Sequence, residues 1–202
     1  MDLALRVGVC VGFCLFYGLS FAAPGRHPAF DQRLSEAGLV YSPPSGFIDD
    51  GPNVVLEKEL SKTLESSKPF VVHQIRSSDQ KIAAYVDIRV LGIDLNSTAL
   101  AIGYPIVFES NAAEYCALVS GGPCRVYAKL PSAVVQTDYH ADLGMILKAE
   151  RPRRSRLVGH KAASVIAISK PSRGLIYTTI LYDSDAEFDK AYEGLKHMLT
   201  FE

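Results

Sequence analysis

Two cysteines, Cys116 and Cys124, flank a Ser-Gly-Gly-Pro turn in the segment EYCALVSGGPCR. Such a pair can belong to a metal site, a redox switch or a structural disulfide. Zinc sites usually need four ligands, often as closely spaced Cys or His pairs, and the sequence contains no CxxC motif. A bridge between the two would close a nine-residue loop and stabilise the fold by roughly 2–3 kcal/mol. The choice between a bridge and free thiols therefore depends on the redox compartment.

The N-terminus has the form of an export signal. Arg6 precedes the apolar run Val7–Leu19, and Ser20 and Ala22 supply the small residues of a cleavage site. We expect cleavage after Ala22, so that residues 1–22 are a signal peptide. The apolar run is shorter than the ~20 residues that a membrane-spanning helix needs, although an uncleaved anchor remains the alternative. A periplasmic or secreted location favours the disulfide.

The composition predicts one globular domain. The chain has 202 residues, of which 48% are hydrophobic and 21% charged, enough to bury a core. A net charge of −1 argues against nucleic acid as a partner, because phosphate binding normally needs a basic excess. We expect residues 23–37, with two prolines and scattered charge, to be a flexible lead-in with at most one short helical turn. Residues 38–202 then form the domain.

Alternating apolar residues predict several strands. In KIAAYVDIRV, one face is apolar, while Tyr85, Asp87 and Arg89 lie on the other face, which we expect to meet water. PFVVHQIR and the turn SSDQ complete a hairpin with this strand. Residues 39–41 form a short strand, and residues 163–182 form a second hairpin whose second strand is apolar on both faces and therefore central.

Helical signals are found in four segments. Residues 53–67 have leucines at helical spacing and an Asn53 cap, although a strand remains possible. Pro105 suits the first turn of a helix towards Cys116, and Gly121 suits its end. PSAVVQTDYHAD opens as a helix. The closing segment SDAEFDKAYEGLKHMLTF has a capping box and an apolar stripe that predicts a helix as far as Leu199.

This order of elements resembles the PsbP/DcrB-like fold. The resemblance rests on the segments YSPPSGF, YHADLGMILKAERP and RGLIYTTILYDSDAEFDKAYEGLKHMLTF, and it covers about residues 38–202. It implies an α+β fold, with an antiparallel β-sheet and helices packed on both faces as an α/β/α sandwich. It implies no catalytic residues and no cofactor, because members share no active site and include photosystem assembly subunits, small-GTPase binders and envelope proteins. Fold alone therefore says little about function.

Asp138, His140 and Asp142 are spaced i, i+2 and i+4 and are a weak candidate metal site. On a strand the three would share one face, whereas on a helix His140 points away from the two aspartates. Pro131 favours the helix, so we expect solvated polar residues at a helix end. His73, beside apolar neighbours in a strand, is predicted to be a buried core histidine.

A basic segment, ERPRRSRLVGHK at residues 150–161, is the second candidate. It can bind an anionic lipid, a phosphate or an acidic protein, although a solvated loop is the simpler interpretation. With the polar strand face described above it gives a candidate interaction surface, whose members are Tyr85, Asp87, Arg89, Arg151, Arg153, Arg154 and Arg156.

The sequence contains no GxSxG, HExxH, P-loop or dinucleotide glycine motif. We therefore predict an exported, non-enzymatic protein-interaction domain, such as an envelope assembly factor or an immunity protein. Its expected partner is another envelope protein, with no nucleic acid, no cofactor and no stable membrane span after signal removal. The alternatives are a small-ligand or lipid-binding periplasmic protein and a metal-dependent hydrolase using Asp138, His140 and Asp142.

Overall fold

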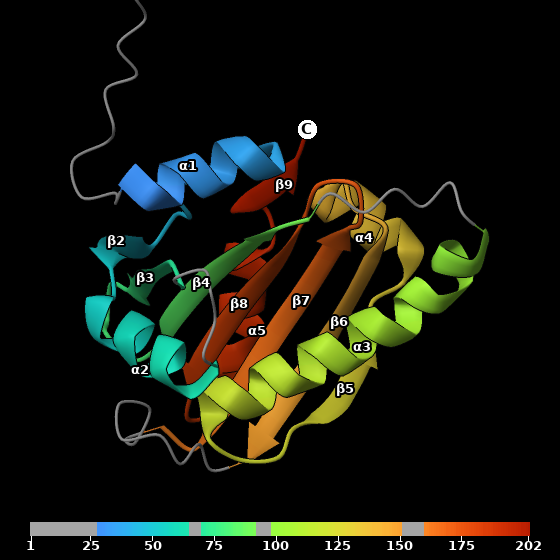
Figure 1. Ribbon diagram of the computed structural model, residues 1–202. Coiled ribbons are helices and arrows are strands. Elements are labelled where there is room, and N and C mark those ends of the chain that lie inside the picture. The colour runs from blue at the N-terminus through green and yellow to red at the C-terminus, as the bar shows by residue number, and fades with distance from the viewer. Residues whose placement is uncertain (1–27, 65–69, 92–97, 151–159) are drawn as a thin grey trace, which may run out of the picture.

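The computed structural model describes residues 28–64, 70–91, 98–150 and 160–202 (Figure 1). Its centre is a seven-stranded, fully antiparallel sheet with the strand order β2-β3-β4-β8-β7-β6-β5. The strands are β2 (Phe47–Pro52), β3 (Val72–Ser77), β4 (Ala83–Val90), β5 (Arg125–Lys129), β6 (Leu143–Glu150), β7 (Ala162–Lys170) and β8 (Gly174–Tyr182). Helices cover both faces, so the predicted α+β sandwich is confirmed.

The hairpin of β7 and β8 forms the middle of the sheet, as predicted from its sequence. Every residue of β8 is buried, because its side chains are apolar on both faces and both faces are covered. The hairpin of β3 and β4 is also confirmed and pairs with β8 through β4. Strands β2, β5 and β6 were not predicted; β2 and β5 form the two edges of this sheet.

Helices α2 (Val54–Leu64) and α3 (Thr98–Ser120) cover one face of the sheet (Figure 1). The Asn53 side-chain oxygen accepts a hydrogen bond from the Leu56 N–H at 2.9 Å, so the ambiguous segment is a capped helix. Helix α3 was correctly predicted, but Pro105 lies inside it rather than in its first turn. Gly121 has φ +71° and ends the helix, as expected for a residue that tolerates the left-handed region.

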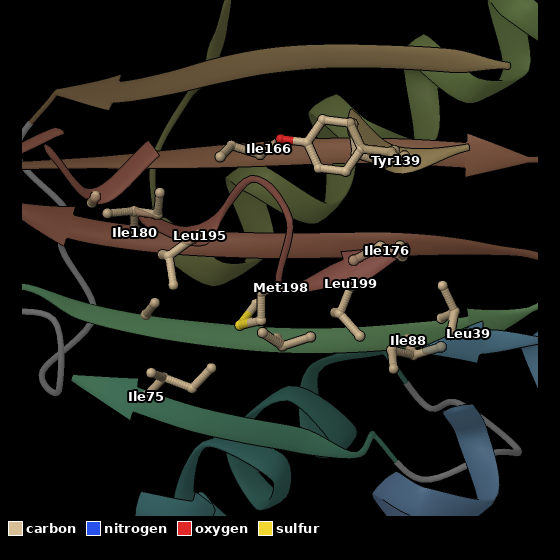
Figure 2. Packing of buried hydrophobic residues seen from close by; sticks show 14 of the residues in the cluster. Leu39, Ile75, Ile88, Tyr139, Ile166, Ile176, Ile180, Leu195, Met198 and Leu199 are labelled. Atoms are coloured by element: carbon tan, nitrogen blue, oxygen red, sulfur yellow. The ribbon is translucent and has the colours of Figure 1, made fainter. Parts of the chain in front are cut away.

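Helices α1 (Pro28–Ala37), α4 (Ser132–Tyr139) and α5 (Asp185–Leu195) contribute to the core on the opposite face. The loose lead-in predicted for residues 23–37 is wrong from Pro28 onward, since α1 is a full helix. Its apolar stripe of Phe30, Leu34 and Ala37 is buried. The first core cluster, drawn in part in Figure 2, is therefore built from both ends of the chain.

The end of the chain differs from the prediction. The capping box of Ser184 and Glu187 is confirmed, but α5 stops at Leu195. The last apolar residues instead form strand β9 (Leu199–Phe201), which pairs antiparallel with β1 (Leu39–Tyr41). Leu199 and Phe201 are buried, so the terminus is held by a small second sheet.

Candidate functional site: the edge strand β5 and the outer face of α3

The cysteine pair forms a disulfide that joins two elements of the candidate site. Cys116 and Cys124 have an S–S distance of 2.02 Å and a Cα–Cα distance of 6.0 Å. Cys116 is fully buried in the last turns of α3, and Cys124 immediately precedes β5. The bridge therefore fixes the start of the edge strand to the end of the helix.

Strand β5 is an edge strand with exposed apolar residues. Val126 is 39% exposed and Tyr127 is 60% exposed. The register with β6 shifts between Val126 and Ala128, so a bulge interrupts the ladder there. The available signal for this strand was the alternation in RVYAK, but five residues between a disulfide turn and a proline give too short a pattern for a prediction.

Positive charge surrounds β5. Arg125 lies opposite Lys148 of β6 in the strand register. The two residues, with Pro123 and Cys124, line a surface hollow of about 280 Å³. The Lys148 Nζ lies 5.7 Å from the centre of the Tyr127 ring and 2.8 Å from Asp185 Oδ1. At the other end of the strand, Lys129 Nζ lies 2.7 Å from Glu109 Oε2 of α3.

The outer face of α3 is apolar and exposed. Ile102 and Ile106 are each 72% exposed, and Val107 is 51% exposed. The opposite side of the helix is packed on the sheet through Tyr104, Phe108 and other side chains of the second core cluster. Because Glu109 connects the helix to Lys129, the exposed aliphatic residues and β5 belong to one neighbourhood.

Tyr85, Asp87 and Arg89 are not an exposed surface, so that prediction is wrong. Tyr85 is buried in the second core cluster and Asp87 is 1% exposed, while the Arg89 side chain is 27% exposed. Alternation correctly placed the three on the face opposite Val86 and Ile88, but α2 and α3 cover that face as well.

Asp87 and Arg89 form an ion pair with each other within the fold. Arg89 Nε lies 2.7 Å from Asp87 Oδ2, and its guanidinium lies 3.9 Å from the centre of the Phe70 ring. Burial raises the pKa of the Asp87 carboxyl, and the charge and hydrogen bond of Arg89 offset part of this effect. Asp87 Oδ1 has no hydrogen-bond partner within the described residues.

Two stacked tyrosines lie near this ion pair. The rings of Tyr115, on α3, and Tyr177, opposite Asp87 in β8, are 4.0 Å apart and nearly parallel. Burial, together with the negative charge of Asp87, raises the pKa of both phenols, so both stay neutral. The face beneath α3 thus holds a polar cluster of Asp87, Arg89, Tyr115 and Tyr177 inside an otherwise apolar core.

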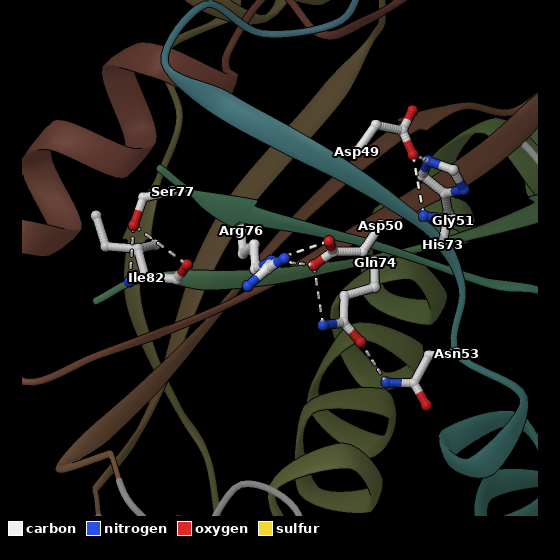
Figure 3. A network of polar contacts seen from close by, with 9 residues as sticks. All are labelled: Asp49, Asp50, Gly51, Asn53, His73, Gln74, Arg76, Ser77 and Ile82. Atoms are coloured by element: carbon white, nitrogen blue, oxygen red, sulfur yellow. Dashed lines mark hydrogen bonds and ion pairs between the residues drawn. The ribbon is translucent and has the colours of Figure 1, made fainter. Parts of the chain in front are cut away.

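His73 is a buried core histidine, as predicted. Its Nε2 lies 2.7 Å from Asp49 Oδ1 (Figure 3). Its ring stacks on Phe30 at 4.2 Å. The Tyr41 hydroxyl donates to Asp49 Oδ2 at 2.9 Å. The ring and carboxylate therefore join α1, β1, β2 and β3 into one unit.

A second acidic residue on β2 has a structural role beside this pair. Figure 3 shows Asp50 contacting both Arg76 and Gln74 of β3, at 2.9 Å and 3.4 Å. The Gln74 side chain in turn accepts a hydrogen bond from Asn53 at 2.8 Å. These contacts hold β2 and β3 together and connect them to the cap of α2.

Asp138, His140 and Asp142 lie at a helix end, as expected, but only Asp138 is inside the helix, and Asp142 lies just before β6. Helix α4 ends at Tyr139, and His140 caps it in the left-handed conformation with φ 52°. The His140 Nδ1 is 3.0 Å from the Phe201 carbonyl oxygen of β9. Across the described ranges of the chain, no group of three His, Cys, Asp or Glu side chains is arranged to hold a metal ion. The basic-segment arginines, Arg151, Arg153, Arg154 and Arg156, lie outside the described residues.

The fold is of the α+β class, with a large antiparallel sheet between two layers of helices. Comparison with protein-family models, curated proteins and solved structures gives no match. Among the helices that the structure describes, none has the length and apolar character needed to cross a membrane.

Proposed function

We propose that this chain is an exported, non-enzymatic protein-interaction domain of the periplasm or the secreted space. The observation that carries the proposal is the exposed aliphatic face of α3, formed by Ile102, Ile106 and Val107. Contiguous exposed aliphatic side chains on a folded domain are typical of contact surfaces. A partner that covers this face would be an envelope protein, in an assembly or an immunity role.

Two further features support this proposal. The disulfide suits an oxidising compartment, in agreement with a signal peptide cleaved after Ala22. The bridge also fixes the start of β5 relative to the last turns of α3, which reduces the ordering cost that binding has to offset. The sequence also resembles the PsbP/DcrB-like fold, and binding roles are common among proteins of that fold.

The test is recovery of partners from an envelope extract with the mature, oxidised chain. An Ile102→Glu and Ile106→Glu double variant places two charges on the exposed face and should abolish recovery of a specific partner. The matched control is Val54→Glu and Val55→Glu, which makes the same kind of change at exposed positions of α2. Equal recovery by all three proteins would remove α3 from the proposal, and no specific partner for the wild type would contradict it.

A second candidate function is the binding of a small ligand between the sheet and α3. The observation that favours it is Asp87 Oδ1, which is buried without a hydrogen-bond partner within the described residues and could accept from an amine or amide. Native mass spectrometry of the purified chain tests this function: a retained ligand that is lost in Asp87→Asn supports it. A wild-type mass equal to that of the bare chain contradicts it.

A further inference from the structure

The free side of β5 is an open template for another strand. Within the described chain, β5 pairs with β6 on one side and with no strand on the other. An edge strand presents backbone N–H and C=O groups that an extended peptide can pair with. At about 3.3 Å per residue, the five residues of β5 offer roughly 17 Å of edge.

The charges at this edge select the kind of strand that can pair with it. Arg125 and Lys129 stand at its two ends, and Lys148 lies beside Arg125. Because of the bulge, Arg125 lies opposite Lys148 and Lys129 lies opposite Met145, so the two end cations are on opposite faces of the sheet. Each face of the edge therefore ends in a cation, and electrostatic complementarity favours an acidic strand over a second copy of this edge.

The acidic partners of Lys129 and Lys148 do not prevent exchange. Glu109 and Lys129 are 40% and 68% exposed, and Asp185 beside Lys148 is 82% exposed. Exposed pairs of this kind contribute about 0–1 kcal/mol each. A carboxylate brought in by a paired strand, with backbone hydrogen bonds holding it in place, can therefore replace them.

We infer that β5 binds an extended acidic segment of a partner protein by strand addition, with carboxylates at Arg125 and Lys129 and an apolar side chain against Tyr127. The inference rests on the proposed function and names the chemistry of the partner. The disulfide at Cys124 fixes the first residue of the edge, and the exposed face of α3 extends the contact beyond Lys129.

The probe for the test is a fluorescein-labelled heptapeptide, Ser-Glu-Thr-Val-Glu-Thr-Ser, whose two Glu side chains lie on opposite faces like Arg125 and Lys129, with an unlabelled copy as competitor. Fluorescence anisotropy with the oxidised chain should give saturable binding that weakens as salt is raised. The Arg125→Glu and Lys129→Glu double variant should bind at least about tenfold more weakly. The same variant should gain binding to the peptide in which Lys replaces both Glu residues.

A matched control separates position from net charge. Lys58→Glu and Lys81→Glu together reverse two exposed cations, one on α2 and one in the turn between β3 and β4, and so change the net charge as much as the β5 double variant. Both positions are far from β5 in the sheet order, and this variant should leave affinity within about twofold. Hydrogen exchange should show new protection at the amides of residues 126–128 when the acidic peptide binds. A purely electrostatic encounter would not protect these amides.

Three results would overturn strand addition: no saturable binding, binding that charge reversal does not affect, or a concentration-dependent dimer of the free chain that pairs through β5. The proposed function and strand addition can be tested independently of each other. If an envelope partner is lost with Ile102→Glu and Ile106→Glu but retained by the β5 double variant, the interaction domain stands and strand addition is wrong.

Discussion

Reducing the bridge between Cys116 and Cys124 should lower the free energy of unfolding by an amount that follows from the loop it closes. The two residues are 8 apart in sequence, so the loop contains nine residues. Closing it removes about 8.6 cal/mol/K of chain entropy from the unfolded state, which is about 2.6 kcal/mol at 25 °C. Because Cys116 stays within a packed cluster after reduction, we expect no large opposing change in the free energy of the folded state.

Urea denaturation of the same chain with and without a phosphine reductant measures this difference. Far-UV circular dichroism is the suitable signal, because the chain has no tryptophan. With a slope near 2 kcal/mol per molar urea, the midpoint should fall by roughly 1.3 M on reduction. The control is the Cys116→Ala and Cys124→Ala double variant, whose midpoint should not respond to the reductant.

Coincident midpoints for the oxidised and reduced chain, with equal slopes, would refute this reasoning. They would mean that the unfolded state is already constrained across this turn, or that the two sulfurs are not bonded in the folded protein. A shift in the double variant as well would indicate that the reductant acts elsewhere. The same reduction should also weaken peptide binding at β5, because Cys124 fixes the start of that strand.

Three further predictions concern the core and α5. Gly174→Ala would place a Cβ 2.8 Å from the Arg89 carbonyl oxygen and should cost about 1–3 kcal/mol in urea denaturation, whereas Gly103→Ala, which meets open space on α3, should stabilise by about 0.5–1 kcal/mol; equal effects would contradict the packing argument. The pKa of Asp87 is raised above its ordinary 3.8, so its contribution to stability is greatest below that pH and falls as the pH rises through the raised pKa. The difference in unfolding free energy between wild type and Asp87→Asn should therefore change with pH across this window, and a constant difference would contradict it. Ser184→Ala removes the cap of α5 and should cost about 1 kcal/mol, measured by the same denaturation; an unchanged midpoint would show that the capping box contributes nothing.

Local patterns predicted the centre of the fold correctly because the information lies within each segment. The β7–β8 hairpin is apolar on both faces, and only a central position buries both. The capping box at Ser184 needs four consecutive residues and no tertiary partner. Helix α1 could also have been predicted, because Pro28 suits a first helical position and Phe30, Leu34 and Ala37 follow helical spacing.

Elements that depend on distant partners were missed or mistaken. The three residues of β9 form a strand only because β1, some 160 residues earlier, pairs with them. Tyr85, Asp87 and Arg89 were assigned to water because alternation separates two faces without revealing what covers the second one. Asp87 is tolerated in the core because Arg89, two residues along the same strand, pairs with it.

The candidate site could be predicted only in part. The disulfide followed from spacing and compartment, and the structure brings the two sulfurs together. The α3 surface could not be found, because a helix that is apolar on all sides gives no indication of which side meets the sheet. The arginines of residues 151–156 lie outside the described residues, so their role stays a prediction.

If a partner binds as proposed, the size of the exposed face requires it to use both α3 and β5. Fully burying an isoleucine or valine contributes about 1.5–3 kcal/mol, and Ile102, Ile106 and Val107 are already partly covered at 72%, 72% and 51% exposure. Their remaining burial is therefore worth about 3–6 kcal/mol in total. Association costs at least about 4 kcal/mol in lost translational and rotational freedom, so the aliphatic face alone gives little net affinity. Backbone pairing at β5 and charge pairing at Arg125 and Lys129 supply the remainder, and the disulfide holds both contributions on one rigid surface.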